Sequence, residues 1–312
     1  MAILIKILIL LIMGFIGSVP SAPADPPSEP VTAVTKVQPA EIEVGQPNQF
    51  KTAGDLLDAL EKADRDIRTF SAQIRYVRIF EIQGDVQTRL GWLWYKTDPT
   101  AEPVPAHLES KPMIRRRSVA VKFDTLVAGG RQDKSDRVWI FDGEWLVEKN
   151  PAERQFIKRR MVRPGQVYDP LRVGEGPFFV PVGQRREDME TFFHARLLDS
   201  GEGLSDEYDS DRDAMFKGLA KKLDGYIQLE LTPRDGFPEV EDFALIRVWY
   251  DPQTLLPRAS MTVDPLGDID VFELFDIDIN EERRPIPVDA FSVKIPGPGD
   301  GYHIEVMDGT VP

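Results

Sequence analysis

Short segments in which apolar and polar residues alternate follow one another along most of the chain, and they constrain its fold more than any other feature. About eleven such segments can be counted, and most are separated by short turns. They cover residues 72–82, 86–96, 118–123, 138–141, 144–147, 155–159, 226–232, 243–250, 259–263, 269–279 and 291–295. A period of two is typical of half-buried β-strands. The series predicts a mainly β protein with one antiparallel sheet of about eleven strands, curled or closed into a barrel.

The clearest of these signals is a hairpin in Val138–Lys149. Two apolar and aromatic runs flank Asp142-Gly143, a residue pair that readily supplies the positive φ angles of a tight turn. On the first strand of this hairpin, Trp139 and Phe141 should face away from Ile140. The segment therefore predicts a β-hairpin with large apolar strands.

Two stretches show helical spacing instead. In the first, apolar residues recur three or four positions apart, at Leu56, Leu60, Ala63, Ile67 and Phe70. Thr52 and Asp55 have the spacing of a capping box at its start. The sequence predicts an amphipathic helix here, followed directly by the first strand.

The second helical stretch begins at Arg186, after a segment rich in glycine and proline. Its predicted apolar face comprises Met189, Phe192, Phe193 and Leu197. A helix between sheet strands should pack over the sheet or cap its mouth. Residues 199–224 are mostly charged, and we expect an exposed acidic loop there with some helix at its end.

The N-terminal region predicts export. Lys6 precedes an apolar run, and small residues at Ala22 and Ala24 suit cleavage after Ala24. We expect a signal peptide over 1–24, a proline-rich disordered linker over 25–51 and one folded domain over 52–312. An uncleaved anchor helix is the alternative, although the run is short for a membrane span.

Composition argues against several functions. The net charge of −14 disfavours nucleic acid as a partner. The absence of cysteine excludes disulfides and a lipid on an N-terminal cysteine. Asp209, Asp211 and Asp213 alternate as in a calcium loop, but Ala214 and Ala220 stand where glycine and glutamate are required. We expect no catalytic residues, no metal and no cofactor, and therefore not an enzyme.

One basic cluster, Arg115–Arg117, stands out in this acidic chain. These residues are either the solvent-exposed start of a strand or a set of guanidinium groups that bind an acidic group of a ligand or partner.

Four segments, in this order, carry a resemblance to a known family. Leu90–Tyr95 resembles its glycine-led second strand, Phe141–Leu146 its Asp-Gly hairpin, Leu229–Pro233 its strand ending in Thr-Pro, and Phe291–Pro296 its final strand. The family is that of the periplasmic outer-membrane lipoprotein carriers of the LolA type, in particular a subgroup with longer chains. The resemblance covers roughly residues 54–307. The family's functional arginine has no match, because Tyr95–Pro99 contains none.

The resemblance implies a half-open antiparallel β-barrel with helices as a lid, which binds acyl chains of lipoproteins in a hydrophobic cavity. Expected partners are lipidated proteins or other acyl ligands, with inner-membrane donor and outer-membrane acceptor proteins, for a monomer in the periplasm. The expected cavity residues are Ile74, Tyr76, Phe80, Trp92, Trp94, Val119, Val121, Phe123, Trp139, Phe141, Trp145, Leu229, Leu231, Trp249 and Phe275. The expected lid residues are Phe178, Met189, Phe192 and Phe193. Any of these side chains could equally fill a core.

Two other functions fit the same fold. One is an envelope sensor or protein-binding module that uses the acidic 199–224 segment as a docking surface. The other is an enzyme acting on a hydrophobic substrate, which ranks last because no nucleophile and base have suitable spacing.

Overall fold

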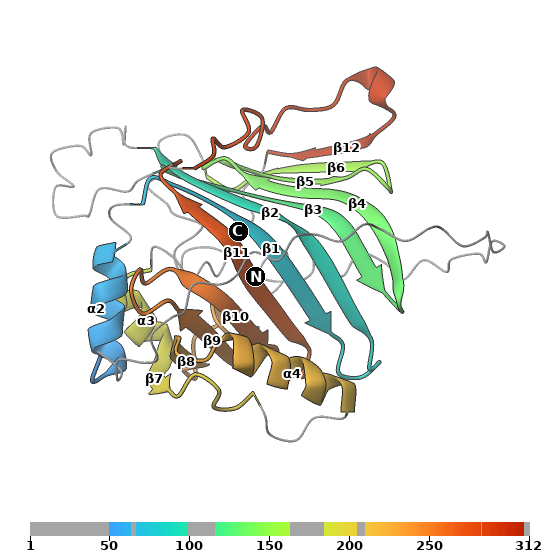
Figure 1. The fold of residues 1–312 in the computed structure, drawn as a ribbon. Helices are drawn as coiled ribbons and strands as arrows, with labels where there is room; N and C mark the ends of the chain where they lie inside the picture. Colours follow the sequence, from blue (N-terminus) through green and yellow to red (C-terminus); the bar gives the residue numbers. More distant parts are fainter. Residues whose placement is uncertain are drawn as a thin grey trace, which may run out of the picture.

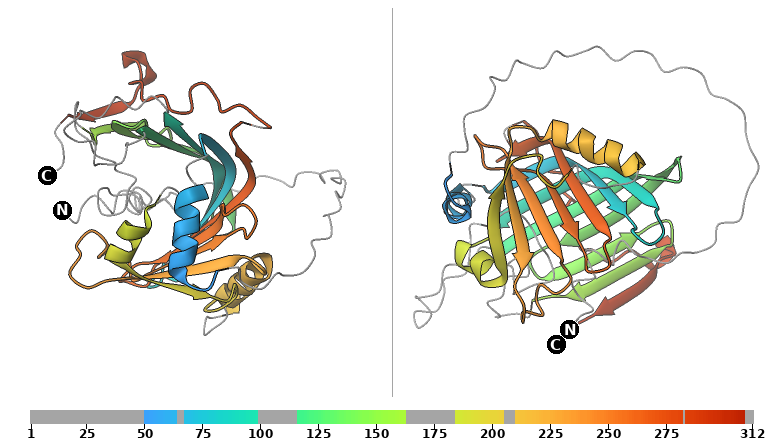
Figure 2. Two further views of the ribbon diagram at one scale, coloured as in Figure 1. Left: turned by 90° about the vertical axis from the view of Figure 1, so that its left-hand side faces the viewer. Right: turned by 90° about the horizontal axis from the view of Figure 1, so that it is seen from below.

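The computed structural model describes residues 50–63, 67–98, 116–162, 184–204, 210–281 and 283–308. Twelve strands form one sheet in the order β12-β6-β5-β4-β3-β2-β1-β11-β10-β9-β8-β7 (Figure 1). Neighbouring strands are antiparallel except β12 and β6, which run parallel. Figure 2 shows the sheet bent into an open half-barrel. The predicted fold class is therefore confirmed, with one strand more than the expected count.

The strands are β1 (Thr69–Ile79), β2 (Val86–Asp98), β3 (Arg116–Ala128), β4 (Arg131–Phe141), β5 (Trp145–Asn150), β6 (Gln155–Arg160), β7 (Phe193–Leu198), β8 (Ile227–Pro233), β9 (Leu245–Tyr250), β10 (Pro257–Val263), β11 (Ile269–Ile279) and β12 (His303–Met307). The helices are α2 (Ala53–Ala63), α3 (Arg186–Phe192) and α4 (Ser210–Lys222), with a short 3-10 turn at Pro298–Asp300.

Helices α2 and α3 lie at the mouth of the half-barrel, on its concave side (Figure 2). Leu56, Leu57 and Met189 pack there against inward residues of β8 and β9. Helix α4 packs on the opposite, convex side of the sheet through Phe216 and Leu219. Helices therefore cover β9 on both sides, which makes this part of the sheet a three-layer core, and α4 also packs on β10, β11 and the end of β1.

The predicted N-terminal cap is confirmed by two hydrogen bonds. The Thr52 amide donates to Asp55 Oδ2 at 3.0 Å, and the Asp55 amide donates to Thr52 Oγ1 at 3.1 Å. The helix that follows ends at Ala63 and does not reach Phe70 as the spacing predicts. Phe70 instead belongs to β1, where pairing with β2 and β11 satisfies its backbone on both sides.

Two further expectations about elements are wrong. Helix α3 starts at Arg186 as predicted but ends at Phe192, because Phe193–Leu198 pairs with the free edge of β8. Residues 291–295 are not a strand, although Phe291 and Val293 do pack on the sheet. The last strand is β12, after prolines and glycines that interrupt the ladder.

The Asp142-Gly143 hairpin is present between β4 and β5. Gly143 has a φ of +96°, and Asp142 Oδ1 accepts hydrogen bonds from the amides of Glu144 at 2.9 Å and Trp145 at 2.7 Å. The aspartate therefore supports the turn with its side chain, and only the glycine takes the positive φ.

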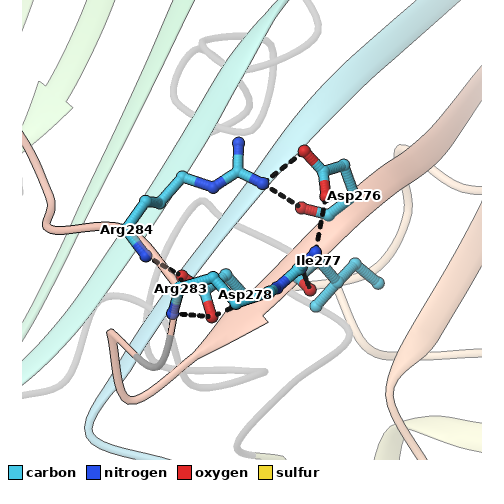
Figure 3. A network of polar contacts seen from close by, with 5 residues as sticks. All are labelled: Asp276, Ile277, Asp278, Arg283 and Arg284. Atoms are coloured by element: carbon cyan, nitrogen blue, oxygen red, sulfur yellow. Dashed lines mark hydrogen bonds and ion pairs between the residues drawn. The ribbon is translucent and has the colours of Figure 1, made fainter.

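A charged network attaches the chain after β11 to the outer side of the sheet (Figure 3). The backbone amides of Arg283 and Arg284 donate to the carboxylate of Asp278, at 3.1 and 2.8 Å. Both guanidinium groups also contact Asp276. The Arg284 guanidinium lies 5.1 Å from the ring centre of Trp92, so this segment covers an outward-facing tryptophan.

Candidate functional site

Strand register determines which residues line the concave side. Across β2, β3 and β4, Leu93 pairs with Val121 and Val121 with Trp139. Tyr95, Val119 and Phe141 form the next such row. In an antiparallel sheet directly paired residues lie on the same face. A buried cluster on this side comprises Ile67, Phe70, Ala72, Ile74, Tyr76, Tyr95, Phe123, Trp139, Phe141, Leu146, Val162, Leu256 and Leu274.

This cluster over β1–β5 and β11 contains no side chain from α2, α3 or α4. Among the described residues, those helices cover β7–β9 and the convex side only. The concave side of β1–β5 is therefore the candidate functional site, and we call it the concave face below.

Seven of the expected cavity residues lie on the concave face: Ile74, Tyr76, Val119, Val121, Phe123, Trp139 and Phe141. Leu229 and Leu231 point to the same side of the sheet but pack under α2 and α3. Phe80 follows β1, with the Arg78 guanidinium 5.0 Å from its ring centre.

The other expected cavity residues are on the outer side, and for these the placement inferred from sequence is corrected. Trp249 packs against α4, and its Nε1 donates to the Ser200 carbonyl at 2.8 Å. Trp94 packs with the segment that contains Phe291. The remaining three are Trp92, which stacks 6.3 Å from Trp94, Trp145, which lies between Lys158 and Arg160, and Phe275, which lies against Arg258. Each aromatic ring has an outer partner that buries part of it, so size alone does not indicate the concave side.

The expected lid residues are placed in part. Met189 in α3 and Phe193 in β7 are buried under the helices, and Phe192 contacts Phe237 at 5.3 Å between ring centres. Phe178 lies outside the described residues. Arg186 joins α3 to α2, because its Nη1 lies 2.7 Å from Asp58 Oδ2.

A row of charged residues crosses the concave face beside the aromatic cluster, and sequence reasoning did not predict it. Arg78 is fully buried, 3.1 Å from Asp268 and 3.5 Å from Asp270. The Tyr76 hydroxyl donates to Asp270 Oδ1 at 2.5 Å. Arg78 is the one residue that breaks the apolar alternation of the first strand, and this break was the available signal.

The row continues through Arg89, Arg137 and Glu148, all of them buried. Arg137 Nη2 lies 3.6 Å from Glu148 Oε1. Arg117, from the basic cluster, is also buried, and Thr97 on β2 is its neighbour across the β2–β3 ladder. Arg115 lies outside the described residues.

Burial changes the acidity of this row. It raises the pKa of Glu148 to about 7, more than the attraction of Arg137 lowers it. Burial likewise raises the pKa of Asp270 to about 6, against the charge of Arg78. The folded protein therefore binds the protons of the Glu148 and Asp270 carboxyl groups more tightly than the unfolded chain does. The stability that they contribute is complete below pH 4 and is lost as the pH rises through 6 and 7.

We expect the free energy of unfolding to fall between pH 5 and pH 8, and Glu148→Gln to reduce that fall by about 1–3 kcal/mol. Urea unfolding at both pH values measures the effect. Glu202→Gln, at an exposed position, is the control for the lost charge and should keep the pH dependence of the parent. A Glu148→Gln protein with the parent's full pH dependence would contradict the prediction.

The described residues thus define an open half-barrel with helices at its mouth and an amphipathic concave face. No protein-family model matches the chain, and no curated protein matches its sequence. No helix in the described part of the chain is long and apolar enough to span a membrane.

Solved structures with a similar fold include a LolA superfamily protein from Nitrosomonas europaea, 13% identical, covering 78% of this chain and 98% of that chain with a TM-score of 0.29. An uncharacterized conserved protein from Thermus thermophilus is 12% identical and has a TM-score of 0.39. The match covers 82% of this chain and 99% of that chain. A chain of the Pseudomonas aeruginosa MucA/MucB complex is 16% identical and has a TM-score of 0.33. The match covers 75% of this chain and 58% of that chain. At these identities and TM-scores the likeness assigns neither a family nor a function to this chain.

Proposed function

We propose that the chain is a periplasmic carrier that binds acyl chains of lipoproteins on the concave face and shields them on the way to the outer membrane. The observation that carries the proposal is the aromatic and aliphatic cluster on β1–β5 and β11, which lies on the same side of the sheet as α2 and α3 and includes no side chain from the helices that the structure describes. The export signal predicted for residues 1–24 and the four family-like segments support the location and the cargo.

The energetics suit reversible transport. Burying one methylene group contributes about 0.8 kcal/mol, so a chain on the order of 12 carbons contributes roughly 10 kcal/mol before the cost of ordering it. Such binding needs apolar contact area and no catalytic residue. The carrier in this proposal is accordingly a binding protein and not an enzyme.

Val121→Gln tests the proposal, because this partly buried residue lies in the middle of the concave face. We expect binding of a fluorescent diacylated lipopeptide to weaken about tenfold or more, since a polar group replaces apolar contact area. Val86→Gln, the same change at an exposed position of β2, should bind like the parent. Circular dichroism establishes that both variants are folded.

Two results would overturn the proposal. One is the absence of acyl material from protein purified from native cells together with no binding of the lipopeptide. The other is equal binding by Val121→Gln and Val86→Gln. Specific capture of a protein partner without any acyl binding would instead support a protein-binding module.

A further inference from the structure

Besides Arg117, three buried arginines lie on the concave face, and they differ in how closely acidic groups surround them. Arg78, Arg89 and Arg137 are 0%, 6% and 9% exposed. A buried guanidinium group presents five N–H donors and is costly unless acceptors surround it. The partners of each arginine therefore show whether its charge is neutralised within the fold.

Arg78 is neutralised by the protein. It forms ion pairs with Asp268, just before β11, and with Asp270, on β11. Asp268 also accepts a hydrogen bond from the Glu81 amide, and Asp270 accepts one from the Tyr76 hydroxyl. This group is a structural pair between β1 and β11.

Arg89 and Arg137 have fewer acidic partners than Arg78. The acceptor for Arg89 among the described residues is the neutral amide of Gln87, at 3.3 Å, and Arg89 Nη1 has no partner there. Arg137 forms an ion pair with buried Glu148 at 3.6 Å, which is longer than a hydrogen bond, and its Nε has no partner among the described residues. Because burial raises the pKa of Glu148 to about 7, this carboxyl carries only part of a negative charge near neutral pH. Burial lowers the pKa of Arg89 and the charges of Arg137 and Arg78 lower it further, while Tyr76 and Asp270 act in the opposite direction. Like charges in a buried place favour an anion as a further partner.

The two arginines lie next to the aromatic side chains of the concave face. Arg89 is the cross-strand partner of Tyr76, and Arg137 is the cross-strand partner of Phe123. Phe123 in turn joins the rings of Tyr76, at 6.0 Å between centres, and Trp139, at 5.4 Å. A cationic row thus borders a buried apolar cluster along adjacent strands.

We propose that Arg89 and Arg137 bind the anionic head group, phosphate or carboxylate, of an acyl lipid whose chain lies along Tyr76, Phe123 and Trp139. Guanidinium groups suit this role because their planar donor pairs match the oxygens of both anions. The proposal rests on the proposed function for the acyl chain and adds the chemistry of the head group.

The test compares probes that share a 12-carbon chain: dodecyl phosphate, dodecanoate and neutral monododecanoyl glycerol, with inorganic phosphate as the free ion. Titration calorimetry on the full folded protein measures each affinity. We expect the parent to bind at least one anionic amphiphile about tenfold more tightly than the neutral one. The amphiphile that binds most tightly identifies the head group, and weak binding of inorganic phosphate would show that the chain is needed.

Arg89→Gln and Arg137→Gln should each lower the affinity for the anionic probe about tenfold more than the affinity for the neutral probe, and so remove that preference. Arg89→Lys retains the charge but loses the paired donors, and it should keep an intermediate preference even if the glutamine variants fold poorly. Arg131→Gln, which changes an exposed arginine of β4, should bind like the parent.

Equal affinity of the parent for charged and neutral amphiphiles would overturn the anion site while leaving acyl binding in place. A preference that persists in both glutamine variants would overturn the assignment to these residues. The absence of binding by every 12-carbon probe would overturn the proposed function as well, so the two failures can be told apart.

Discussion

Gly91→Ala is expected to destabilise the fold by about 3 kcal/mol or more, one of the largest effects of any methyl-sized change in this chain. A Cβ at this position would lie 1.9 Å from the Lys122 carbonyl oxygen and 2.8 Å from the Phe123 Cα. Both are backbone atoms of β3, next to the register shift between Leu90 and Gly91. Relief of the clash therefore requires β2 and β3 to separate, and urea unfolding measures the loss.

Gly218→Ala in α4 is the matched control. The residue is helical, and apart from its chain neighbours and the backbone of α4 no heavy atom lies within 4 Å of a Cβ added there. Alanine should stabilise this helix by about 0.5–1 kcal/mol, because glycine loses more backbone freedom on folding. If both variants lost the same stability, the close approach of β3 to Gly91 would be contradicted.

Trp249→Ala is expected to lower the free energy of unfolding by about 3–5 kcal/mol. The side chain is fully buried with Phe216 and Leu219 of α4, and the change also leaves the Ser200 carbonyl without its indole donor. Thermal and urea unfolding, followed by circular dichroism, measure the loss. A folded variant of reduced stability that binds acyl probes like the parent would agree with the position of Trp249 on the convex side.

Trp145→Ala is the control for removal of an indole. Trp145 is only partly buried on the outer side, with Lys158 and Arg160 at 4.6 and 4.4 Å from its ring. Its loss should cost about 1 kcal/mol or less. Equal costs for Trp145→Ala and Trp249→Ala would contradict the packing of α4 on the sheet.

Local chemistry predicted the elements that depend on neighbours in sequence. The Thr52 and Asp55 cap, the turn at Gly143 and the start of α3 at Arg186 all follow from residues within four positions of one another. These features required no knowledge of the tertiary structure.

The concave face was predicted only in part, because a period of two separates the two faces of a strand without saying which is concave. Of the five tryptophans, Trp139 alone lies on the concave face. The others face outward, where α4, the segment after β11 or basic side chains cover them. Those covers come from distant parts of the chain, so no local pattern reveals them.

The buried arginine row was missed for the same reason. Arg78 and its partner Asp268 are 190 residues apart, and Arg89 and Arg137 meet only after three strands have paired. A charged residue on an apolar strand face was a visible anomaly at Arg78. Its meaning depended on partners that only the folded sheet brings together.

The pairing of β1 with β11 makes folding of this sheet a whole-chain event. Strands β1–β6 and β7–β11 each pair mostly with sequence neighbours, and the Tyr76–Asp270 bond, which spans 194 residues, lies in the join between them. Joins of such high sequence separation form slowly, because a long loop must close before its contacts can stabilise it. Each half exposes a bare strand edge, β1 or β11, until the join forms. The period before this closure is when the chain is most exposed to aggregation through strand pairing.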